Sequence, residues 1–354
     1  MKGIILAGGM GKRLRPLTHS GPKQLIPIAN KPVLHYAIEN LAEAGITEIG
    51  IIVGYTPERI NAIKDACGDG TRWGARISYI EQDAPRGLAH AVWTAKDFLG
   101  DSNFVVYLGD NMIGGGIKKF VEDFRRSGAD ASLLLSESKT PEKFGVAEIA
   151  AGKIISVEEK PAHPRSNMVI TGVYIFRQTL MDHIKGLKPS TRNELEITHA
   201  IQSLLASGGK IQYHVINDWW DDTGSYDDVL HANEMMLSSL KSLIEGTIDH
   251  KTKITGAVEL GRNSVVRESI INGPVKIGMN CIIERSELGP NTSIGDNTVI
   301  RNGTIAGSII IGDAVIEAAG KKIAGSLIGK RVSIAAHNGQ FARLVLGEDS
   351  EVTI

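Results

Sequence analysis

The sequence of 354 residues has little cysteine, no long hydrophobic run and no excess of charge of one sign. Its two cysteines, Cys67 and Cys281, stand far apart and form no metal-type spacing, so we expect free thiols in a reducing compartment. No stretch approaches the ~18–20 apolar residues of a membrane span. A strand-like run begins almost at Met1, so we expect no signal peptide. These absences predict a cytoplasmic protein without a membrane partner.

The charges are balanced, with 39 basic and 40 acidic residues and a net charge of −1. They are spread along the chain, whereas non-specific binding to nucleic acid needs a basic stripe. We therefore expect no nucleic-acid partner. Apolar residues make up 42% and charged residues 22%, as is usual for globular proteins. The length exceeds what one core usually organises and predicts two domains.

Up to about residue 225, short β-rich apolar runs alternate with longer helical patterns. This alternation predicts an α/β fold with a Rossmann-like, mostly parallel sheet. The expected strands cover residues 3–7, 49–54, 77–81, 104–108 and 131–136, and one expected helix covers residues 33–44. A second helical pattern runs over residues 226–245, before Gly246.

Beyond about residue 250 the only aromatic residue is Phe341, and an aliphatic-glycine pair recurs every 17 residues. The pairs are Leu260-Gly261, Ile277-Gly278, Ile294-Gly295, Ile311-Gly312 and Ile328-Gly329. Six-residue steps between them predict a parallel β-helix of about five coils, and the pattern resembles the left-handed hexapeptide-repeat family. We expect a first domain over residues 1–240, a linker helix and connector over 241–253, and the β-helix domain over 254–354.

The opening segment GIILAGGMGKRLRP is a strand that enters a glycine-rich turn with basic residues. Glycine amides approach phosphate oxygens closely, and Lys12, Arg13 and Arg15 add positive charge, so the turn predicts an anion cradle. It is not a Walker A loop, because Arg13 follows Gly11-Lys12. It is not a dinucleotide fingerprint either, because position 14 is Leu14.

Two further charged residues stand where substrates are commonly bound. Lys23 precedes an apolar stretch, where a lysine in a cleft serves as a point charge on phosphate. Asp110 ends a buried strand, and ligands of parallel α/β sheets bind at the carboxyl ends of strands. A carboxylate there suits a hard divalent cation such as Mg²⁺.

Nine sequence blocks, spread over most of residues 3–224 in family order, resemble the glucose-1-phosphate thymidylyltransferases. They are LAGGMGKRLRP, PKQLIPIANKPVLHY, YIEQDAPRGLAHA, YLGDN, EKFGVAEI, EEKPAHPRSN, ITGVYIF, RNELEIT and WWDDTG. The hexapeptide-repeat tail resembles the long form of that family. The first domain is thus expected to be a nucleotidyltransferase that joins dTTP and glucose 1-phosphate and releases pyrophosphate.

The resemblance implies a role for each matching residue. Gln82 would read the pyrimidine, since a carboxamide offers a donor and an acceptor to N3–H and O4. The implied nucleotide site comprises Leu6, Gly8, Gly9, Gly11, Lys12, Arg13, Lys23, Gln24, Gln82, Gly87 and Asp110. The implied sugar-phosphate site comprises Asn111, Gly145, Glu159, Lys160, Ile170 and Arg192. Asp110 and Asp222 would hold Mg²⁺, and Arg13, Lys23, Asp110, Lys160 and Asp222 would carry catalysis.

Two positions depart from the family pattern: Lys12 replaces a common threonine, and Asp221 stands beside Asp222. Because the sugar phosphate is already an anionic nucleophile, we expect no catalytic Ser, Cys or His, and positioning with charge neutralisation should supply most of the rate.

Three alternatives stay open. The same chemistry could use UTP or another nucleoside triphosphate with a different sugar or cyclitol 1-phosphate. The chain could be a non-catalytic assembly subunit, although its charged site residues are all present. The β-helix could carry an acyltransferase, with His337 as its acid/base candidate. We expect instead that the β-helix, the catalytic domain or both form a homo-oligomer.

Overall fold

The computed structural model describes residues 1–335, 341–342 and 344–353, which fall into two compact units. The first unit comprises Met1–Gly9 and Val33–Asp222. The second unit comprises Met10–Pro32 and Thr223–Ile354. The short segment 10–32 therefore groups with the carboxyl-terminal part of the chain, and each unit is described by itself below.

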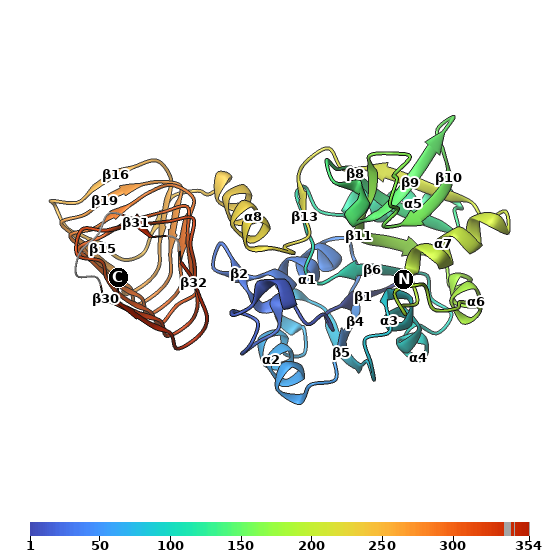
Figure 1. The fold of residues 1–354 in the computed structure, drawn as a ribbon, viewed down its shortest axis with the longest axis horizontal. Coiled ribbons are helices and arrows are strands. Elements are labelled where there is room, and N and C mark those ends of the chain that lie inside the picture. The colour runs from blue at the N-terminus through green and yellow to red at the C-terminus, as the bar shows by residue number, and fades with distance from the viewer. Residues whose placement is uncertain (336–340, 343, 354) are drawn as a thin grey trace. The chain divides into compact units, whose positions relative to one another are not determined.

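A nine-stranded mixed sheet forms the first unit (Figure 1). Seven strands follow the order β10-β9-β11-β6-β1-β4-β5; β8 pairs with β11 and β12. The pairs among β6, β1, β4 and β5 are parallel, and β9, β10 and β11 pair antiparallel. The strands are β1 (Lys2–Leu6), β4 (Glu48–Val53), β5 (Arg76–Glu81), β6 (Phe104–Leu108), β8 (Ala131–Glu137), β9 (Gly145–Ala150), β10 (Lys153–Glu159), β11 (Met168–Phe176) and β12 (Ile211–Val215).

Helices cover both faces of this sheet, as the alternation of β1 side chains requires. Ile4 and Leu6 join the core formed with α3 (Leu88–Thr94), α4 (Lys96–Leu99), α6 (Leu180–Lys185) and α7 (Ile197–Ala206). A Cβ at Gly3 would point the other way and lie 2.9 Å from Leu41 of α1 (Val33–Glu43). Helices α2 (Pro57–Cys67) and α5 (Lys118–Ser127) pack with β4 and β8. The α/β class is confirmed, and the five predicted strands agree within one residue at each end.

Smaller elements complete the secondary structure of the two units. The pairs β7 (Met112–Ile113) with β13 (Trp220–Asp221) and β2 (Pro27–Ile28) with β3 (Lys31–Pro32) are antiparallel. Single 3₁₀ turns are η1 (Lys12–Leu14), η2 (Lys23–Leu25), η3 (Thr71–Trp73) and η4 (Pro141–Lys143). Cys67 and Cys281 are free and buried, as predicted, and burial raises the pKa of the Cys67 thiol to about 12. Among the described residues, each helix is too short or too polar to cross a bilayer.

The helix predicted over residues 226–245 is shorter than expected. Ser225 caps the amino-terminal end of α8 (Tyr226–Ser238), and its Oγ accepts a hydrogen bond from Asp228 N at 3.3 Å. Leu243 and Ile244 form strand β14 and pair in parallel with β17. The prediction was wrong at Leu243 and Ile244. Their apolar spacing fits a helix, but hydrogen bonding to the next coil holds them in an extended strand.

Short parallel strands in three sheets build the second unit (Figure 1), confirming the predicted β-helix class. The first sheet stacks β14 (Leu243–Ile244), β17 (Val258–Leu260), β20 (Val275–Ile277), β23 (Thr292–Ile294), β26 (Ile309–Ile310), β29 (Leu327–Ile328) and β32 (Val345–Leu346). The second stacks β15 (Thr247–Ile248), β18 (Val265–Arg267), β21 (Ile282–Glu284), β24 (Val299–Arg301), β27 (Val315–Glu317), β30 (Ser333–Ala335) and β33 (Glu351–Thr353). The third stacks β16 (Lys253–Thr255), β19 (Ile270–Asn272), β22 (Glu287–Leu288), β25 (Thr304–Ala306), β28 (Lys322–Ala324) and β31 (Phe341–Ala342).

The 17-residue repeat has a direct cause in this stack. Val275 pairs with Thr292 and Ile277 with Ile294, so equivalent residues lie one above the other. A Cβ at Gly261 would lie 2.6 Å from the carbonyl carbon of Gly278, so a side chain at that corner would strike the next coil. The glycine marks predicted about five coils, whereas two of the three sheets contain seven strands. The prediction counted only coils that carry the aliphatic-glycine pair at the 17-residue spacing, so it missed the others.

Substitutions at two adjacent residues of β27 would measure how much the buried aliphatic side chains stabilise the β-helix. Ile316 is fully buried and Val315 is 42% exposed. We expect Ile316→Ala to reduce the stability of the second unit by about 2–5 kcal/mol, because it leaves a cavity in a packed core. Val315→Ala should change it by no more than about 0.5 kcal/mol. Urea unfolding followed by circular dichroism would measure both, and equal midpoints would contradict the packing described.

Candidate functional site

Four parallel strands of the first unit end at one edge of the sheet. Gly8 follows β1, Gly54 follows β4, Gln82 follows β5 and Asp110 follows β6. The amide of Gly109 donates to the carbonyl of Leu6 at 3.0 Å, which joins the ends of β1 and β6. The structure therefore brings Leu6, Gly8, Gln82 and Asp110, all predicted for the nucleotide site, to one edge, with Gly9 next along the chain. Carboxyl-terminal edges of this kind are where α/β proteins bind ligands.

Gln82 is buried at 7% exposure, and its carboxamide has a defined orientation. A Cβ at Gly8 would lie 3.1 Å from Gln82 Oε1, so glycine leaves room for that oxygen. Gln82 Nε2 lies 3.0 Å from His90 Nδ1, and His90 Nε2 lies 3.3 Å from Asp83 Oδ1. Burial, followed by the charge of Arg86, lowers the pKa of His90 and favours the neutral ring. A neutral His90 with its proton on Nε2 accepts from Gln82 and donates to Asp83.

His90 was not predicted as a site residue. The sequence signal was its place in the block YIEQDAPRGLAHA, eight residues after Gln82 and in the first turn of α3. Gly87, predicted to contact the base, also has a packing role. It adopts φ 102° and a Cβ there would lie 2.5 Å from the carbonyl oxygen of Leu195. Only glycine fits where those two backbones meet.

A buried amide connects the end of β6 with two other elements. Asn111 is 2% exposed, and its Oδ1 accepts from Trp220 Nε1 at 2.6 Å and from Gly172 N at 3.3 Å. Its Nδ2 donates to Asp110 Oδ1 at 3.1 Å. Asn111 therefore holds the Asp110 carboxylate in place relative to β11 and β13. Its predicted contact with the sugar phosphate stays a prediction.

The second predicted metal ligand reaches the same edge through the pair β7–β13. Asp221 lies opposite Met112 in this antiparallel ladder, so Asp222, one residue later, comes beside Asn111 and the end of β6. Asp221 is buried at 8% exposure and Asp222 is half-buried. The two adjacent acids therefore differ in environment, and Asp222 has the greater access to solvent.

Three residues predicted for the sugar site form one cluster where β9, β10 and β11 meet. A Cβ at Gly145 would lie 3.4 Å from Glu159 Oε2 and 3.6 Å from Ile170 Cδ1. It would also lie 2.8 Å from Thr198 Cγ2, and Thr198 Oγ1 donates to Glu159 Oε2 at 3.1 Å. Gly145 thus permits the close packing of Thr198 beside the Glu159 carboxylate at the start of an edge hairpin.

The charges around Glu159 are closely paired. Arg192 Nη2 donates to Glu159 Oε1 at 3.2 Å and to Glu196 Oε1 at 2.8 Å. Burial, and then the Glu196 charge, raise the pKa of Glu159, while Arg192 and Lys160 act in the opposite direction. Glu196 is 3% exposed and was not predicted, although the block RNELEIT contains it. It stabilises the cation that lies against Glu159.

Lys160 follows directly after β10 in an unusual conformation. Its φ is 44°, its amide donates to Phe144 O at 2.9 Å, and its Nζ lies 4.0 Å from Glu159 Oε1. The Phe144 ring packs edge-on against Trp220 with centroids 5.2 Å apart. A chain of contacts thus runs from Asp110 through Asn111 and Trp220 to the turn that carries Lys160.

The remaining predicted residues lie in segment 10–32 of the second unit. Gly11 adopts φ 61°, and a Cβ there would lie 2.9 Å from Lys23 Cβ, so glycine permits their close approach. Lys12 and Arg13 are exposed in η1. Gln24 is 1% exposed, and its Oε1 is buried without a hydrogen-bond partner among the described residues. An orphaned acceptor beside Lys23 fits a ligand that supplies a donor.

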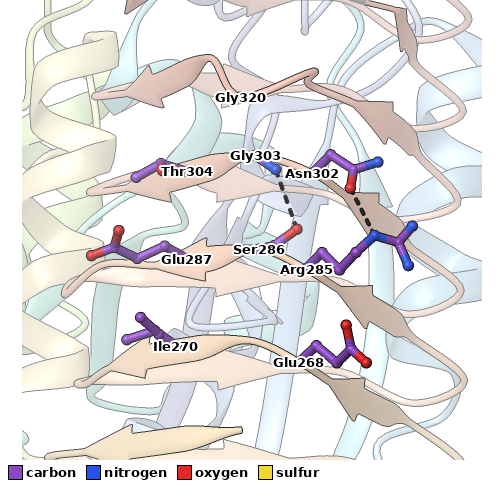
Figure 2. Close-up of a pocket in the computed structure, with 9 residues that line it drawn as sticks. All are labelled: Glu268, Ile270, Arg285, Ser286, Glu287, Asn302, Gly303, Thr304 and Gly320. Carbon is purple, nitrogen blue, oxygen red and sulfur yellow. Dashed lines mark hydrogen bonds between the residues drawn. The ribbon is translucent and has the colours of Figure 1, made fainter. Parts of the chain in front are cut away.

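A groove of about 410 Å³ is lined by residues of four successive coils of the β-helix (Figure 2). Its floor is formed by small residues, Ser286, Gly303 and Gly320. Two of the rim charges have partners: Arg285 Nε donates to Asn302 Oδ1 at 2.9 Å, and Lys251 Nζ donates to Glu268 Oε1 at 2.6 Å. The lining residues that the structure describes include no histidine. His337, the acyltransferase candidate, lies outside the described residues.

Comparisons with known proteins agree on one family. The nucleotidyl transferase family model matches residues 2–239. A glucose-1-phosphate thymidylyltransferase of Streptomyces antibioticus is 47% identical over 271 residues, covering 76% of this chain and 75% of the relative. The low-salt glycan biosynthesis nucleotidyltransferase Agl11 of Haloferax volcanii is 46% identical over 265 residues, covering 75% and 74%. A solved Bacillus anthracis structure, assigned as a glucose-1-phosphate thymidylyltransferase and bound to a sucrose, superposes with a TM-score of 0.62. It is 39% identical and covers 66% of this chain and 94% of that one.

The charge cluster makes a prediction that is independent of any reaction. We expect Arg192→Ala to raise the pKa of Glu159 further, because it removes a cation that favours the carboxylate and leaves burial and Glu196 to disfavour it. A ¹³C NMR titration of the Glu159 carboxyl would measure the change. Arg165→Ala is the control, since Arg165 pairs with Glu148 at 3.7 Å and is 75% exposed. A Glu159 pKa that stays constant or falls in Arg192→Ala would refute the described electrostatics.

Proposed function

The chain belongs to the nucleotidyl transferase family, and from this premise we propose that it joins dTTP and glucose 1-phosphate to give dTDP-glucose and pyrophosphate. An oxygen of the sugar phosphate forms a bond to the α-phosphorus of the triphosphate. The bond from that phosphorus to the oxygen bridging to the β-phosphorus breaks, and pyrophosphate leaves. Relatives that bear the thymidylyltransferase name, one of them 47% identical, support the choice of substrates.

One observation supports this proposal above the others. A single sheet places Gln82 and Asp110 at the same edge, and Asn111 and Trp220 connect that edge with the turn carrying Lys160. The residues that we assign to the base, to the cation and to the sugar phosphate thus belong to one continuous framework. In-line transfer requires such relative positioning more than it requires a reactive side chain.

For the nucleotide, we assign base recognition to Gln82 and triphosphate binding to Arg13 and Lys23. Gln82 Oε1 accepts from N3–H of thymine while its second Nε2 proton donates to O4. Cytosine presents the reverse pattern and would need the carboxamide turned over. His90 opposes that rotation, because its neutral Nδ1 accepts only from the amide nitrogen. The chain thereby distinguishes thymine from cytosine by the orientation of one side chain.

For the metal, Asp110 and Asp222 fit Mg²⁺, because both are carboxylates at the ends of neighbouring segments and Mg²⁺ prefers oxygen ligands. Asn111 holds Asp110 in position, as outer hydrogen bonds to metal ligands commonly do. Bound Mg²⁺ would neutralise negative charge on the phosphates. The assignment of Asp222 over Asp221 rests on its greater exposure and on the Asp-Thr-Gly match.

For the sugar phosphate, we assign the hexose to the cluster around Gly145, where the Glu159 carboxylate accepts its hydroxyl groups. Ile170 and Asn111 line the same region, and Arg192 and Lys160 supply positive charge for the phosphate. Since the attacking oxygen is already anionic, no side chain has to remove a proton. Lys160, Arg13 and Lys23 act by stabilising charge and by holding reactants in line.

Two further expectations belong to the proposal. The β-helix offers stacked coils with open ends that suit homo-oligomer formation. A cytoplasmic location agrees with substrates that are metabolites.

Release of pyrophosphate from dTTP and glucose 1-phosphate tests the proposed reaction. We expect Asp110→Asn and Lys160→Ala each to lower kcat/KM at least ~100-fold, since each removes charge that stabilises the transition state. Activity should also disappear with a chelator and return with excess Mg²⁺. Asp101→Asn and Lys153→Ala replace exposed residues outside the site and should retain activity. Absence of release in the wild-type protein with any common nucleoside triphosphate and sugar 1-phosphate would refute the function.

The orientation of Gln82 gives a separate test of base selectivity. We expect His90→Ala to lower the ratio of kcat/KM for dTTP over dCTP about tenfold, because loss of one hydrogen bond lets the carboxamide rotate. His250→Ala, at an exposed position of the β-helix, is the control. An unchanged ratio in His90→Ala would show that His90 does not orient Gln82.

A further inference from the structure

The segment that carries Arg13 and Lys23 ends in a tight hairpin within the second unit. Strands β2 and β3 pair through Pro27 with Pro32 and Ile28 with Lys31. The two residues at the tip, Ala29 and Asn30, have φ values of 46° and 60°. Such turns place both central residues in the left-handed region, which asparagine tolerates well. The tip is therefore a defined structure that can present its polar groups to a partner.

Both tip residues are hydrogen-bonded to the carboxyl-terminal part of the same unit. Asn30 Nδ2 donates to the carbonyl of Ile294, in the coil strand β23, at 2.7 Å. The amide of Ala29 donates to Oδ1 of Asn233, a fully buried residue of α8, at 2.9 Å. Residues about 200 to 260 positions away in sequence thus hold the end of the hairpin.

Both the oxygen and the nitrogen of the Asn233 carboxamide form hydrogen bonds at this junction. Besides Ala29 N, its Oδ1 accepts from Ser293 Oγ at 2.8 Å, and its Nδ2 donates to Asn291 O at 3.0 Å. One side chain therefore joins the hairpin, α8 and β23. A buried polar network that is fully hydrogen-bonded favours one arrangement of its members, since alternatives leave polar groups unpaired.

The hydrogen bonds matter because packing around the hairpin is incomplete. A cavity of about 210 Å³ lies beside the tip, lined by Pro27, Asn30, Asp296 and Lys330 among others. At the other part of the segment, a Cβ at Gly347 of the last coil would lie 3.3 Å from Pro16 Cβ, so these backbones are close neighbours. Between these two contacts stands η2, which carries Lys23, while η1, which carries Arg13, lies just before Pro16.

We propose that the β-helix and α8 hold the triphosphate-binding segment in its working position, with Asn30 and Asn233 as positioning residues. The proposal rests on the proposed function for its consequence in catalysis, while the anchoring itself rests on the contacts above. It assigns the β-helix a task in substrate binding in addition to any role in assembly. Only five residues lie between Lys23 and Ala29, so freedom at the tip passes directly to the segment that carries Lys23.

Asn30→Gly is the sharpest test, because it removes the side-chain amide that donates to Ile294, while glycine readily adopts the same left-handed backbone conformation. The Ile294 carbonyl also accepts from Gly278 N at 2.7 Å, so the coil loses no obligatory hydrogen bond. Asn263→Gly is the matched control: its φ is 61° and its amide donates to Asn280 at 3.2 Å on the exposed side of the coil stack. Each full-length protein would be assayed by hydrogen–deuterium exchange of residues 11–29 and by steady-state kinetics.

We expect faster exchange in Asn30→Gly and a KM for dTTP raised about threefold to tenfold, the usual worth of one hydrogen bond. The KM for glucose 1-phosphate and the melting temperature should stay at wild-type values, and Asn263→Gly should change neither exchange nor kinetics. Unchanged exchange in Asn30→Gly would overturn the anchoring. Faster exchange with an unchanged KM for dTTP, or an equal rise of both KM values, would overturn the positioning role. If wild type has no activity, the proposed function fails while exchange still decides the anchoring.

Discussion

The parallel register of β6, β1, β4 and β5 is the constraint on which the candidate site depends. Neighbouring strands of a sheet lie about 4.8 Å apart, so the residues that follow them compete for the same small volume. A Cβ at Gly8 would lie 3.1 Å from Gln82 Oε1, and a Cβ at Gly54 would lie 3.4 Å from the carbonyl oxygen of Gly8. Glycine after these two strands therefore lets the backbones approach closely and leaves room for the buried Gln82 side chain.

Asn111 connects this edge of the parallel strands with the antiparallel half of the sheet. A buried amide without partners is costly, and Asn111 has partners on three sides: Asp110, the backbone of β11 and the Trp220 indole. Moving any one of these would leave a buried polar group unpaired. The same indole contacts Phe144, which binds the amide of Lys160, so the acid and the lysine are held by one rigid set of contacts. Gly172 belongs to this arrangement, since a Cβ there would lie 2.6 Å from the Asn111 carboxamide carbon.

The elements that the sequence predicted well are those where periodicity and burial agree. The buried positions of the five strands and the first helix are apolar with few exceptions, such as Ser132, and the repeat of the β-helix is enforced by stacked backbones. The end of α8 was predicted wrongly because Leu243 and Ile244 fit a helical spacing, and only pairing with β17 decides their structure. Gly145, Glu159 and Ile170 were named from motifs and come together in space. His90, Glu196 and Asn233 could not be assigned, because each acts through a neighbour that only the fold supplies.

Segment 10–32 belongs to the same compact unit as residues that lie about 200 positions later in the sequence. Its apolar residues Leu14 and Ile28 are buried, yet the polar groups at its tip are satisfied by α8 and β23 instead of by the sheet that follows it in sequence. A basic segment repels itself and binds an anionic ligand best when it is ordered beforehand, since ordering at the moment of binding costs affinity. Carbonyl groups at the rim of a β-helix provide such order at small cost, because each has a second lone pair left after the coil bond is made. Helix α8 and the stack of coils thus supply fixed hydrogen-bond partners for the tip of this basic segment.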